Sequence, residues 1–245
     1  MKYEMTDNTQ VVNGETLTQI RALRDIGDHT KAGDLGGWIA EEYTLSSFGD
    51  CWIDTNVKMC YGSFISGNAY ITGDSIISGY SNIGDNVYID ADVTIRTEGI
   101  IKGNARIASD DPNVRIQLTI KSLYIFDNAI INQSVVSRHP VTIKGNVTVD
   151  CPLNLNESLI IDGNETILIP PTAFMDLWPV SITPKYISIG CQHHTAEEWW
   201  SFDDATIHKM HRIQALAWWK ANKETIRNLH NDQVEALNKL QPQSN

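Results

Sequence analysis

Residues 65–107 read ISGNAYITGDSIISGYSNIGDNVYIDADVTIRTEGIIKGNARI and carry an isoleucine at every sixth position. The spacing extends back through Met59 to Ile53, so ten aliphatic residues follow one another at this interval without a gap. A small or modest residue stands four positions after each of the first nine. A period of six matches neither the 3.6-residue turn of an α-helix nor a two-residue alternation. It is typical of a short strand followed by a turn, and three such units predict a coil of 18 residues.

The same spacing resumes at Ile125 and continues to Ile167, and it stays in phase because residues 107 and 125 differ by 18. Between the two blocks, Leu118 and Ile120 fit the pattern if one residue is inserted near Asp111 and one is removed near Lys121. We therefore expect a bulged coil there, and no extruded loop.

One turn position supports the 18-residue period independently. It lies three residues after Ile53 and carries an Asn or Asp in each coil. Residues that tolerate a positive φ, often Gly, precede it, as a tight corner requires. The sequence predicts that these side chains stack in a single column along one corner: Asn56, Asp74, Asp92, Asp110, Asn128, Asn146 and Asn164.

The pattern divides the chain into three parts. Residues 1–44 are predicted to form an N-terminal β cap and entry segment, in which Asn13-Gly14 is a turn signal between two strands. Residues 45–172 are predicted to form a parallel β-helix of about seven coils, and residues 173–245 a connector and Trp-rich C-terminal helices. The fold class is therefore mainly β, with a C-terminal α-helical tail. Caps are expected because open ends of a β-helix expose unpaired strand edges.

The C-terminal part carries two helix signals. Thr195 with Glu198 forms a capping box, and Asp203 or Asp204 is positioned to cap the next helix. A helical wheel places Trp219 off the apolar face of this second helix. The predicted face collects Ile207, Met210, Ile213, Ala217, Trp218 and Ala221.

Composition excludes several classes of protein. Thirty acidic residues against nineteen basic ones give a net charge of −11, and no basic stripe is present, so nucleic-acid binding is disfavoured. No apolar run approaches membrane-spanning length, and residues 1–10 lack the features of a signal peptide. We expect a cytoplasmic location, in the host cytoplasm if the protein is phage-encoded.

The four cysteines show no CxxC pair and no secretory context. Neither a zinc site nor a disulfide framework is indicated. Reduced thiols are expected at Cys51, Cys60, Cys151 and Cys191, and no metal site is predicted.

The entry to the repeat resembles a known family. KAGDLGGWI at 31–39, Leu45-Ser46, and GDCWI at 49–53 leading into the six-residue units resemble the YdcK-like family of enterobacterial and prophage proteins. The string 189–199, IGCQHHTAEEW, is similar to the ending of many phage-encoded proteins with such repeats. The resemblance implies a left-handed β-helix, the fold also used by hexapeptide acyltransferases. It does not by itself imply an activity, since one fold supports many functions.

No catalytic residue is assigned, and the candidate for one is His139, the single histidine of the predicted β-helix. An acyltransferase needs such a base to deprotonate the acceptor. Lys121 occupies the stacking position one coil earlier, so Lys121, Arg138 and His139 could form a small anion-binding patch. The alternative is a solvated corner histidine, which we favour because no extruded loop is expected. One histidine also cannot supply the three ligands of a zinc site.

The tail concentrates five of the seven tryptophans in 42 residues. Tryptophan is enriched at binding interfaces, so part of the cluster could bind a partner; a purely internal cap core is the alternative. For the two adjacent histidines the alternative is structural capping, which we favour. The candidate binding residues are Trp199, Trp200, Trp218, Trp219, His193 and His194.

Two hypotheses about function remain, and the single histidine, the missing loop and the Trp-rich tail favour the first. The first is a non-catalytic phage or prophage accessory protein, a rigid scaffold without cofactor that binds a host protein or a small molecule. The second is an acyl-coenzyme-A-dependent acyltransferase that uses acetyl-CoA, with His139 as general base. A homo-oligomer is expected in both cases, most plausibly a trimer by analogy with other left-handed β-helices.

Overall fold

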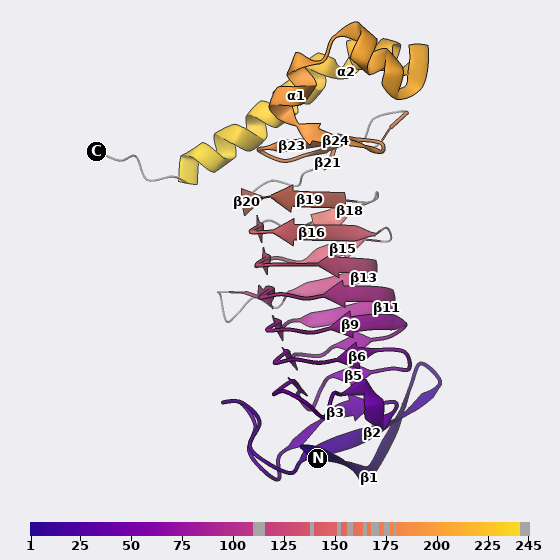
Figure 1. Ribbon diagram of the computed structural model, residues 1–245, viewed down its shortest axis with the longest axis vertical. Helices are drawn as coiled ribbons and strands as arrows, with labels where there is room; N and C mark the ends of the chain where they lie inside the picture. Colours follow the sequence, from indigo (N-terminus) through magenta and orange to yellow (C-terminus); the bar gives the residue numbers. More distant parts are fainter. Residues whose placement is uncertain are drawn as a thin grey trace, which may run out of the picture.

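The computed structural model describes residues 1–109, 116–137, 140–150, 153–155, 159–163, 166–167, 172–173, 177–178 and 180–240. The molecule is a long prism (Figure 1), with an N-terminal β-hairpin at one end and helices at the other. The predicted parallel β-helix with its β cap and helical tail is confirmed.

The prism has three flat sides, called faces 1, 2 and 3 in chain order. Face 1 holds β4 (Trp52–Ile53), β7 (Tyr70–Thr72), β10 (Tyr88–Asp90), β12 (Arg106–Ala108), β14 (Ile130–Ile131), β17 (Thr148–Val149) and β20 (Thr166–Ile167). Face 2 holds β3 (Leu35–Ile39), β5 (Lys58–Met59), β8 (Ile76–Ile77), the first parts of β11 (Asp92–Ile101) and β13 (Gln117–Ile125), β15 (Val135–Ser137) and β18 (Leu153–Leu155). Face 3 holds β6 (Phe64–Ile65), β9 (Tyr80–Ile83), the second parts of β11 and β13, β16 (Val141–Gly145) and β19 (Leu159–Gly163).

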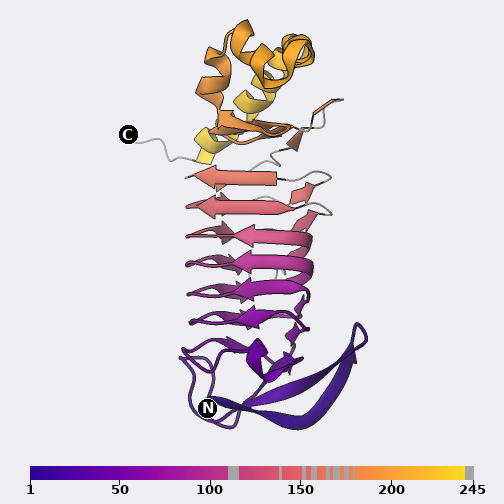
Figure 2. The ribbon, with the colours of Figure 1, turned by 45° about the vertical axis from the view of Figure 1, so that its right-hand side comes forward.

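The coil is left-handed, as the family resemblance implies. In Figure 2 the near strands point to the left while successive coils advance upwards from the N-terminus. Seven strands stack on face 1, so the chain makes about six turns between the first and the last of them.

The aliphatic residues at every sixth position form the core. Ile71, Ile89 and Ile107 pair in register on face 1, and each is completely buried. The same is true of the isoleucines at 65, 77, 83, 95 and 101 on the other faces. A side chain at every sixth residue points inward because each strand-and-turn unit covers one side of the triangle. The six-residue period is therefore confirmed as the pattern of the core.

One coil is longer than predicted. Ile101 pairs with Ile125 and Ile107 with Ile131, so this coil takes 24 residues, and Asp92 pairs with Gln117, 25 residues on. The prediction of an 18-residue bulged coil is wrong. An added unit of six keeps the phase of the pattern, so the sequence period could not reveal it. Residues 110–115, at the junction of faces 1 and 2, lie outside the described residues.

The long coil also divides the predicted Asx column between two corners. At the corner between faces 1 and 2, the Asp74 amide donates to Asp92 Oδ1 over 2.9 Å. The later members stack instead at the corner between faces 3 and 1, where each amide donates to the next over 2.7–2.9 Å. This Asn ladder consists of Asn68, Asn86, Asn104, Asn128 and Asn146. Asp110 and Asn164 of the predicted column lie outside the described residues.

The residue before each ladder Asn turns the corner with a positive φ. At Gly67 φ is 67°, and a Cβ there would lie only 2.6 Å from the Asp85 carbonyl oxygen. Glycine is therefore required at Gly67 both for its backbone conformation and for the close stacking of coils. Asp85 and Asp127 adopt the same conformation with φ of 57° and 63°, which Asp tolerates better than most residues.

The N-terminal cap closes the first coil. β1 (Tyr3–Val12) and β2 (Glu15–Ala22) form an antiparallel hairpin around Asn13-Gly14, as predicted, and β2 pairs with β3. Lys2 is 1% exposed, and its Nζ donates to the Cys51 carbonyl over 2.8 Å and lies 3.1 Å from Cys51 Sγ. The Tyr3 hydroxyl donates to the carbonyls of Glu42 and Leu45. Backbone groups of the first coil are thus satisfied by the cap.

The C-terminal cap is a small sheet covered by helices. β21 (Thr172–Ala173), β22 (Val180–Ile182), β23 (Tyr186–Ile189) and β24 (Gln192–Thr195) form an antiparallel sheet, followed by α1 (Ala196–Ser201) and α2 (Asp204–Leu240). The predicted capping box of Thr195 and Glu198 is confirmed. The Thr206 amide donates to Asp203 Oδ1 over 2.7 Å, which confirms Asp203 as the cap of α2. No helix in the described residues is long and apolar enough to cross a membrane.

The long helix α2 is bent. Lys220 Nζ lies 2.5 Å from Asp204 Oδ2, although the two residues are 16 apart in sequence. In a straight helix they would be separated by about 24 Å along the axis. The two arms of α2 therefore fold toward each other, as the ribbon in Figure 1 also shows.

Replacing Ile89 by Asp is expected to prevent folding, because the carboxylate would enter a dry column between Ile71 and Ile107 with no partner. Ile89→Ala should cost about 2–5 kcal/mol in the free energy of unfolding. The neighbouring Asp90 is exposed, so Asp90→Ala is the matched control and should melt like the parent. Thermal unfolding by circular dichroism measures all three, and parent-like melting of Ile89→Asp would contradict the assigned core.

The N-terminal cap should loosen at alkaline pH. Burial, with help from the negative charge of Glu42, raises the pKa of the Tyr3 hydroxyl to about 12. The folded state therefore holds the proton more tightly than the unfolded chain, whose tyrosine titrates near 10, so stability should fall between about pH 10 and pH 12. Tyr3→Phe should show a weaker loss in that range when unfolding by urea is followed as a function of pH. An unchanged pH dependence would show that Tyr3 is not the group responsible.

Candidate functional site

The corner between faces 2 and 3 collects basic residues. Arg96 is exposed there on β11, and Lys121 lies on β13 one coil further on. The register pairs Ile120 with Ser137 and Leu123 with Val141 on either side of the same corner. The predicted patch residues Arg138 and His139 lie outside the described residues, and Lys121 is described only in its backbone. The anion-binding patch of these three residues therefore stays a prediction.

Face 2 forms a flat, uncharged strip beside this corner. The outward residues Thr94, Thr119 and Val136 pair in register on successive coils. None of them carries a charge. The basic corner lies along one edge of the strip. The chain segments before and after residues 110–115 lie along the other edge. The long coil and the basic corner therefore lie on opposite edges of one flat surface.

The tryptophan cluster belongs to the core of the C-terminal cap. Trp199 and Trp219 are 2% and 4% exposed, and the Trp199 indole N–H donates to the Ile187 carbonyl over 2.7 Å. Trp200 is partly buried and stacks on Trp219, with the Arg227 guanidinium 5.0 Å from its ring centre. Trp218 meets Trp178 edge to face at 5.3 Å. These contacts are those of an internal core, the alternative kept open from the sequence.

The prediction that Trp219 lies off the buried face of its helix is wrong. Ile213 is 75% exposed, and Ala217 and Ala221 are also exposed, although all three were assigned to the apolar face. The bend in α2 changes which side of each arm faces the core. A single helical wheel drawn across both arms therefore assigns these residues to the wrong face.

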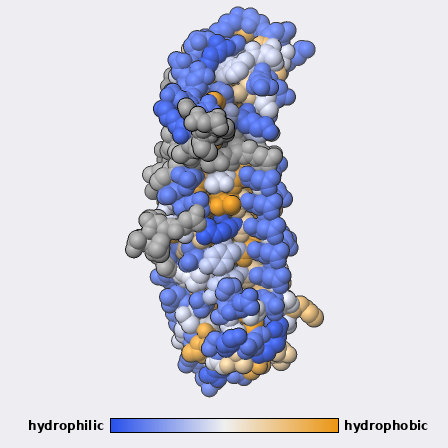
Figure 3. All heavy atoms as spheres, turned by 90° about the vertical axis from the view of Figure 1, so that its left-hand side faces the viewer, coloured by the Kyte–Doolittle hydropathy of each residue, from blue (hydrophilic) through white to orange (hydrophobic). Residues whose placement is uncertain are grey.

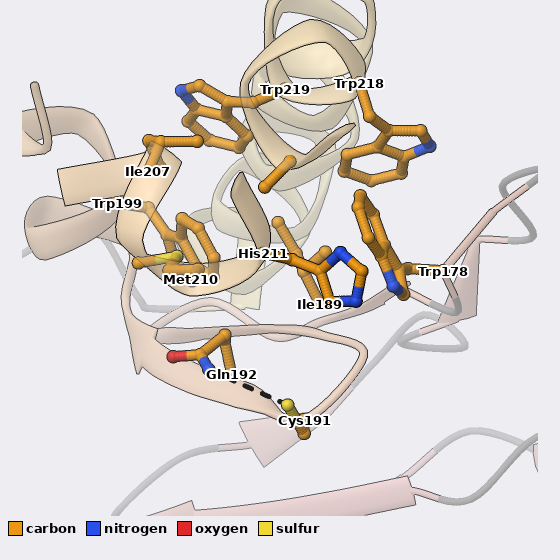
Figure 4. A pocket seen from close by; sticks show the side chains of 11 residues that line it. Trp178, Ile189, Cys191, Gln192, Trp199, Ile207, Met210, His211, Trp218 and Trp219 are labelled. Atoms are coloured by element: carbon orange, nitrogen blue, oxygen red, sulfur yellow. Dashed lines mark hydrogen bonds between the residues drawn. The ribbon is translucent and has the colours of Figure 1, made fainter. Parts of the chain in front are cut away.

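A half-open pocket lies in this cap (Figure 4). Trp178, Trp218, His211 and Met210 line it, with Cys191 and Gln192 at the wall formed by the sheet. Its volume is about 60 Å³, enough for a few water molecules and too small for a cofactor or drug-sized ligand. The pocket is therefore a packing feature of the cap.

The two adjacent histidines face opposite sides of the terminal sheet. His193 Nδ1 lies 2.7 Å from the Ser188 hydroxyl, its cross-strand neighbour, and the ring stacks on Tyr186. His194 packs edge to face against Trp199 and Phe202. Each ring has a structural environment of its own. Across the ranges described, no group of three His, Cys, Asp or Glu residues is arranged to hold a metal ion.

The two buried cysteines are not activated. Burial raises the pKa of the Cys60 thiol to about 11 and also raises that of Cys51. Cys191 is exposed on the terminal sheet, and all three are free thiols. Cys151 lies outside the described residues.

The sequence analysis missed an open aromatic groove near the N-terminal end. It lies beside a short 3₁₀ helix, η1 (Glu42–Thr44), and has a volume of about 450 Å³. Seven residues line it: Glu42, Tyr43, Leu45, Ser46, Ser47, Phe48 and Phe64. Leu45-Ser46 belongs to the family resemblance, but no pattern in the sequence marks the lining as a site, and only the exposure of the rings in the folded chain reveals it. The side of the molecule in Figure 3 is mostly hydrophilic, with small separate hydrophobic areas.

Comparison with known proteins gives one partial likeness. The chain is 47% identical over 75 residues to the uncharacterized acetyltransferase YdcK of Escherichia coli (strain K12). The match covers 30% of this chain and 23% of that protein, so the chain spans about a quarter of its relative. No family model matches the chain. The likeness and the β-helix together agree with the left-handed β-helix resemblance of the sequence.

Trp219→Ala is expected to lower the free energy of unfolding of the C-terminal cap by about 3–5 kcal/mol, because it empties a buried site between Trp199 and Trp200. Ile213→Ala, at a 75% exposed position on the same helix, is the control and should change stability by less than about 0.5 kcal/mol. Urea unfolding followed by tryptophan fluorescence compares them. Equal stabilities of the two variants would mean that Trp219 is not part of the core.

Proposed function

We propose that this chain is an acyl-coenzyme-A-dependent acyltransferase whose reaction takes place beside the long coil. The observation that carries the proposal is the 24-residue coil, which adds a unit of chain at one edge of face 2 while basic residues lie at the other edge. Support comes from the partial likeness to a protein named as an acetyltransferase.

The described surface suits acetyl-CoA as co-substrate. The phosphates of acetyl-CoA are anionic, and Arg96 supplies positive charge at the corner between faces 2 and 3, where the backbone of Lys121 lies one coil further on. The uncharged strip of Thr94, Thr119 and Val136 offers a flat surface for the neutral pantetheine arm. Binding of this anion to an acidic protein therefore depends on a local cluster of positive charge.

In this proposal His139 is the general base. Its imidazole removes the proton of an acceptor hydroxyl or amine as the acceptor oxygen or nitrogen attacks the thioester carbonyl carbon. The new C–O or C–N bond forms while the C–S bond breaks. The thiolate of coenzyme A leaves with the shared electron pair and takes up the proton.

A non-catalytic binding scaffold is the second candidate. Three arguments favoured it from the sequence: the missing loop, the Trp-rich tail and the single histidine of the β-helix. The coil of 24 residues weakens the first, and the burial of Trp199 and Trp219 weakens the second. The exposed aromatic groove beside η1 is the observation that still favours binding. A host-protein partner and a phage origin stay predictions.

We also propose that the active form is a homo-oligomer, most plausibly a trimer formed by flat prism sides. An acyl donor lying along face 2 would then be covered by the neighbouring copy. Light scattering in solution tests this proposal, and a mass near 27 kDa would refute it.

Acetyl-CoA binding by calorimetry, and release of free coenzyme A with a panel of amine and hydroxyl acceptors, test the function. Arg96→Ala and Lys121→Ala should each weaken binding by about 10-fold, the effect of a lost charge-assisted contact. His139→Ala should bind normally and lose transfer by about 10²–10⁴-fold. Lys209→Ala, at an exposed position on α2, is the matched control for charge. Absence of acetyl-CoA binding by the parent at millimolar concentration would refute the proposal.

A further inference from the structure

We infer that the groove beside η1 is a binding site for neutral saccharides, separate from the proposed acyl-transfer site. The groove lies on the coil of β6, and β9 and β11 separate it along face 3 from β13, the strand of Lys121. The inference therefore does not depend on the proposed acyltransferase activity.

The backbone of the groove is firmly held. Leu45 is buried and forms a parallel bridge with Ile65, and the Ser46 amide donates to the Ile65 carbonyl over 2.9 Å. The Tyr3 hydroxyl donates to the Leu45 carbonyl from the N-terminal cap. The Phe48 amide donates to Ser46 Oγ over 3.1 Å. The groove is thus built on the first coil of face 3, and its shape is fixed before any ligand binds.

Two aromatic rings of the groove are exposed to solvent. Tyr43 is 57% exposed and Phe48 is 85% exposed, while Phe64 is half-buried in the same groove. Complete burial of a phenylalanine side chain stabilises a fold by roughly 1.5–3 kcal/mol. Because Phe48 is exposed, its side chain contributes little of this stabilisation to the fold. Three rings gathered in one concave site form a patch, which marks a ligand site better than scattered apolar residues do.

The polar lining indicates the chemistry of the ligand. Glu42 brings a carboxylate, and Ser46 and Ser47 bring hydroxyl groups, whereas no Lys or Arg lines the groove. A carboxylate accepts hydrogen bonds and repels anions, so phosphorylated and acidic ligands are disfavoured. A sugar ring stacks its C–H face on an aromatic ring and donates hydroxyl protons to a carboxylate at the ring edge. A neutral saccharide therefore satisfies both parts of the lining at once.

Other occupants fit less well. A stable protein interface uses about 20–30 residues on each side, and seven residues line this groove. A proline-rich peptide also packs on aromatic rings, but proline has no N–H group and would leave the Glu42 carboxylate without a donor.

The surface next to the groove favours an oligosaccharide over a single sugar. Phe64 pairs with Asn82 on the next coil, which places an amide side by side with the ring. Tyr80 is 80% exposed at the neighbouring corner, and Tyr61 is 56% exposed. Successive coils lie about 4.8 Å apart, so a chain of sugars running along the axis would meet a new row of side chains at each coil. Affinity is therefore expected to increase with the length of the oligosaccharide.

Calorimetric titration with cellohexaose, maltohexaose, mannohexaose and chitohexaose tests the inference, with the corresponding disaccharides as length controls. At least one hexasaccharide should bind saturably and more tightly than its disaccharide. Phe48→Ala and Tyr43→Ala should each weaken this binding at least 10-fold, and Phe48→Leu should not restore it because the ring is lost. Glu42→Gln should weaken it several-fold. Ile213→Ala, an exposed apolar position in the C-terminal cap, should leave it unchanged.

Melting temperatures of these variants should equal that of the parent, because the altered side chains are exposed. The inference is overturned if no hexasaccharide binds at millimolar concentration, or if binding is indifferent to Phe48→Ala. It is also overturned if a decaproline peptide binds in place of the sugars, or if Phe48→Ala dissociates an oligomer without changing sugar binding. Acetyl-CoA binding should be the same in Phe48→Ala and the parent. Sugar binding therefore tests the groove, and acetyl-CoA binding tests the acyltransferase proposal independently.

Discussion

Every backbone amide and carbonyl of a β-helix strand must find its partner on the coil above or below, and at the two ends of the rod one of those coils is missing. The rest of the structure follows from this requirement. At the N-terminal end the chain supplies an antiparallel hairpin, the Lys2 ammonium on the Cys51 carbonyl and the Tyr3 hydroxyl on the carbonyls of η1 and Leu45. At the C-terminal end it supplies a small antiparallel sheet, with the tryptophans packed between that sheet and the bent helix α2. The concentration of tryptophan in the tail is thus explained by closure of the rod.

Most of the fold could be predicted from residue spacing, because the core of a β-helix is periodic. Ile71, Ile89 and Ile107 occupy the positions that the six-residue period assigned to them. The same period concealed the long coil, since an extra unit of six leaves the phase unchanged while it moves each later strand to the next side of the prism. The Asn ladder shows the shift, because Asn104 bonds to Asn128 across 24 residues. The face that Trp219 uses could not be predicted, since it depends on the bend that brings Lys220 to Asp204.

Some features of the candidate sites could be predicted from the periodic sequence, and others appear only in the folded chain. The register of Ser137 and Val141 on β13 agrees with the spacing, and the stacking of Arg138 and His139 near Lys121 stays a prediction. Spacing did not predict the longer coil at the opposite edge of face 2. This coil weakens one argument for a binding scaffold and so favours an acyltransferase. The aromatic groove lies where η1 joins the first coil, and its rings are recognisable only because the fold leaves them exposed. Irregular positions at the ends and insertions of a regular rod are therefore where function is best sought.

The stacking of each coil on the one before it also determines how this protein can reach its native state. Most parallel sheets join strands that are distant in sequence, and such folds form slowly because long loops must close first. Here a strand such as β10 finds its partner β7 only 18 residues earlier, a separation of about 0.07 of the chain length. Contacts between residues this near in sequence need only short loops to close, which favours fast folding. Once the hairpin of β1 and β2 has paired with β3, each newly synthesised coil can pair with the folded coil that precedes it. The rod can therefore grow from its N-terminus at the pace of translation.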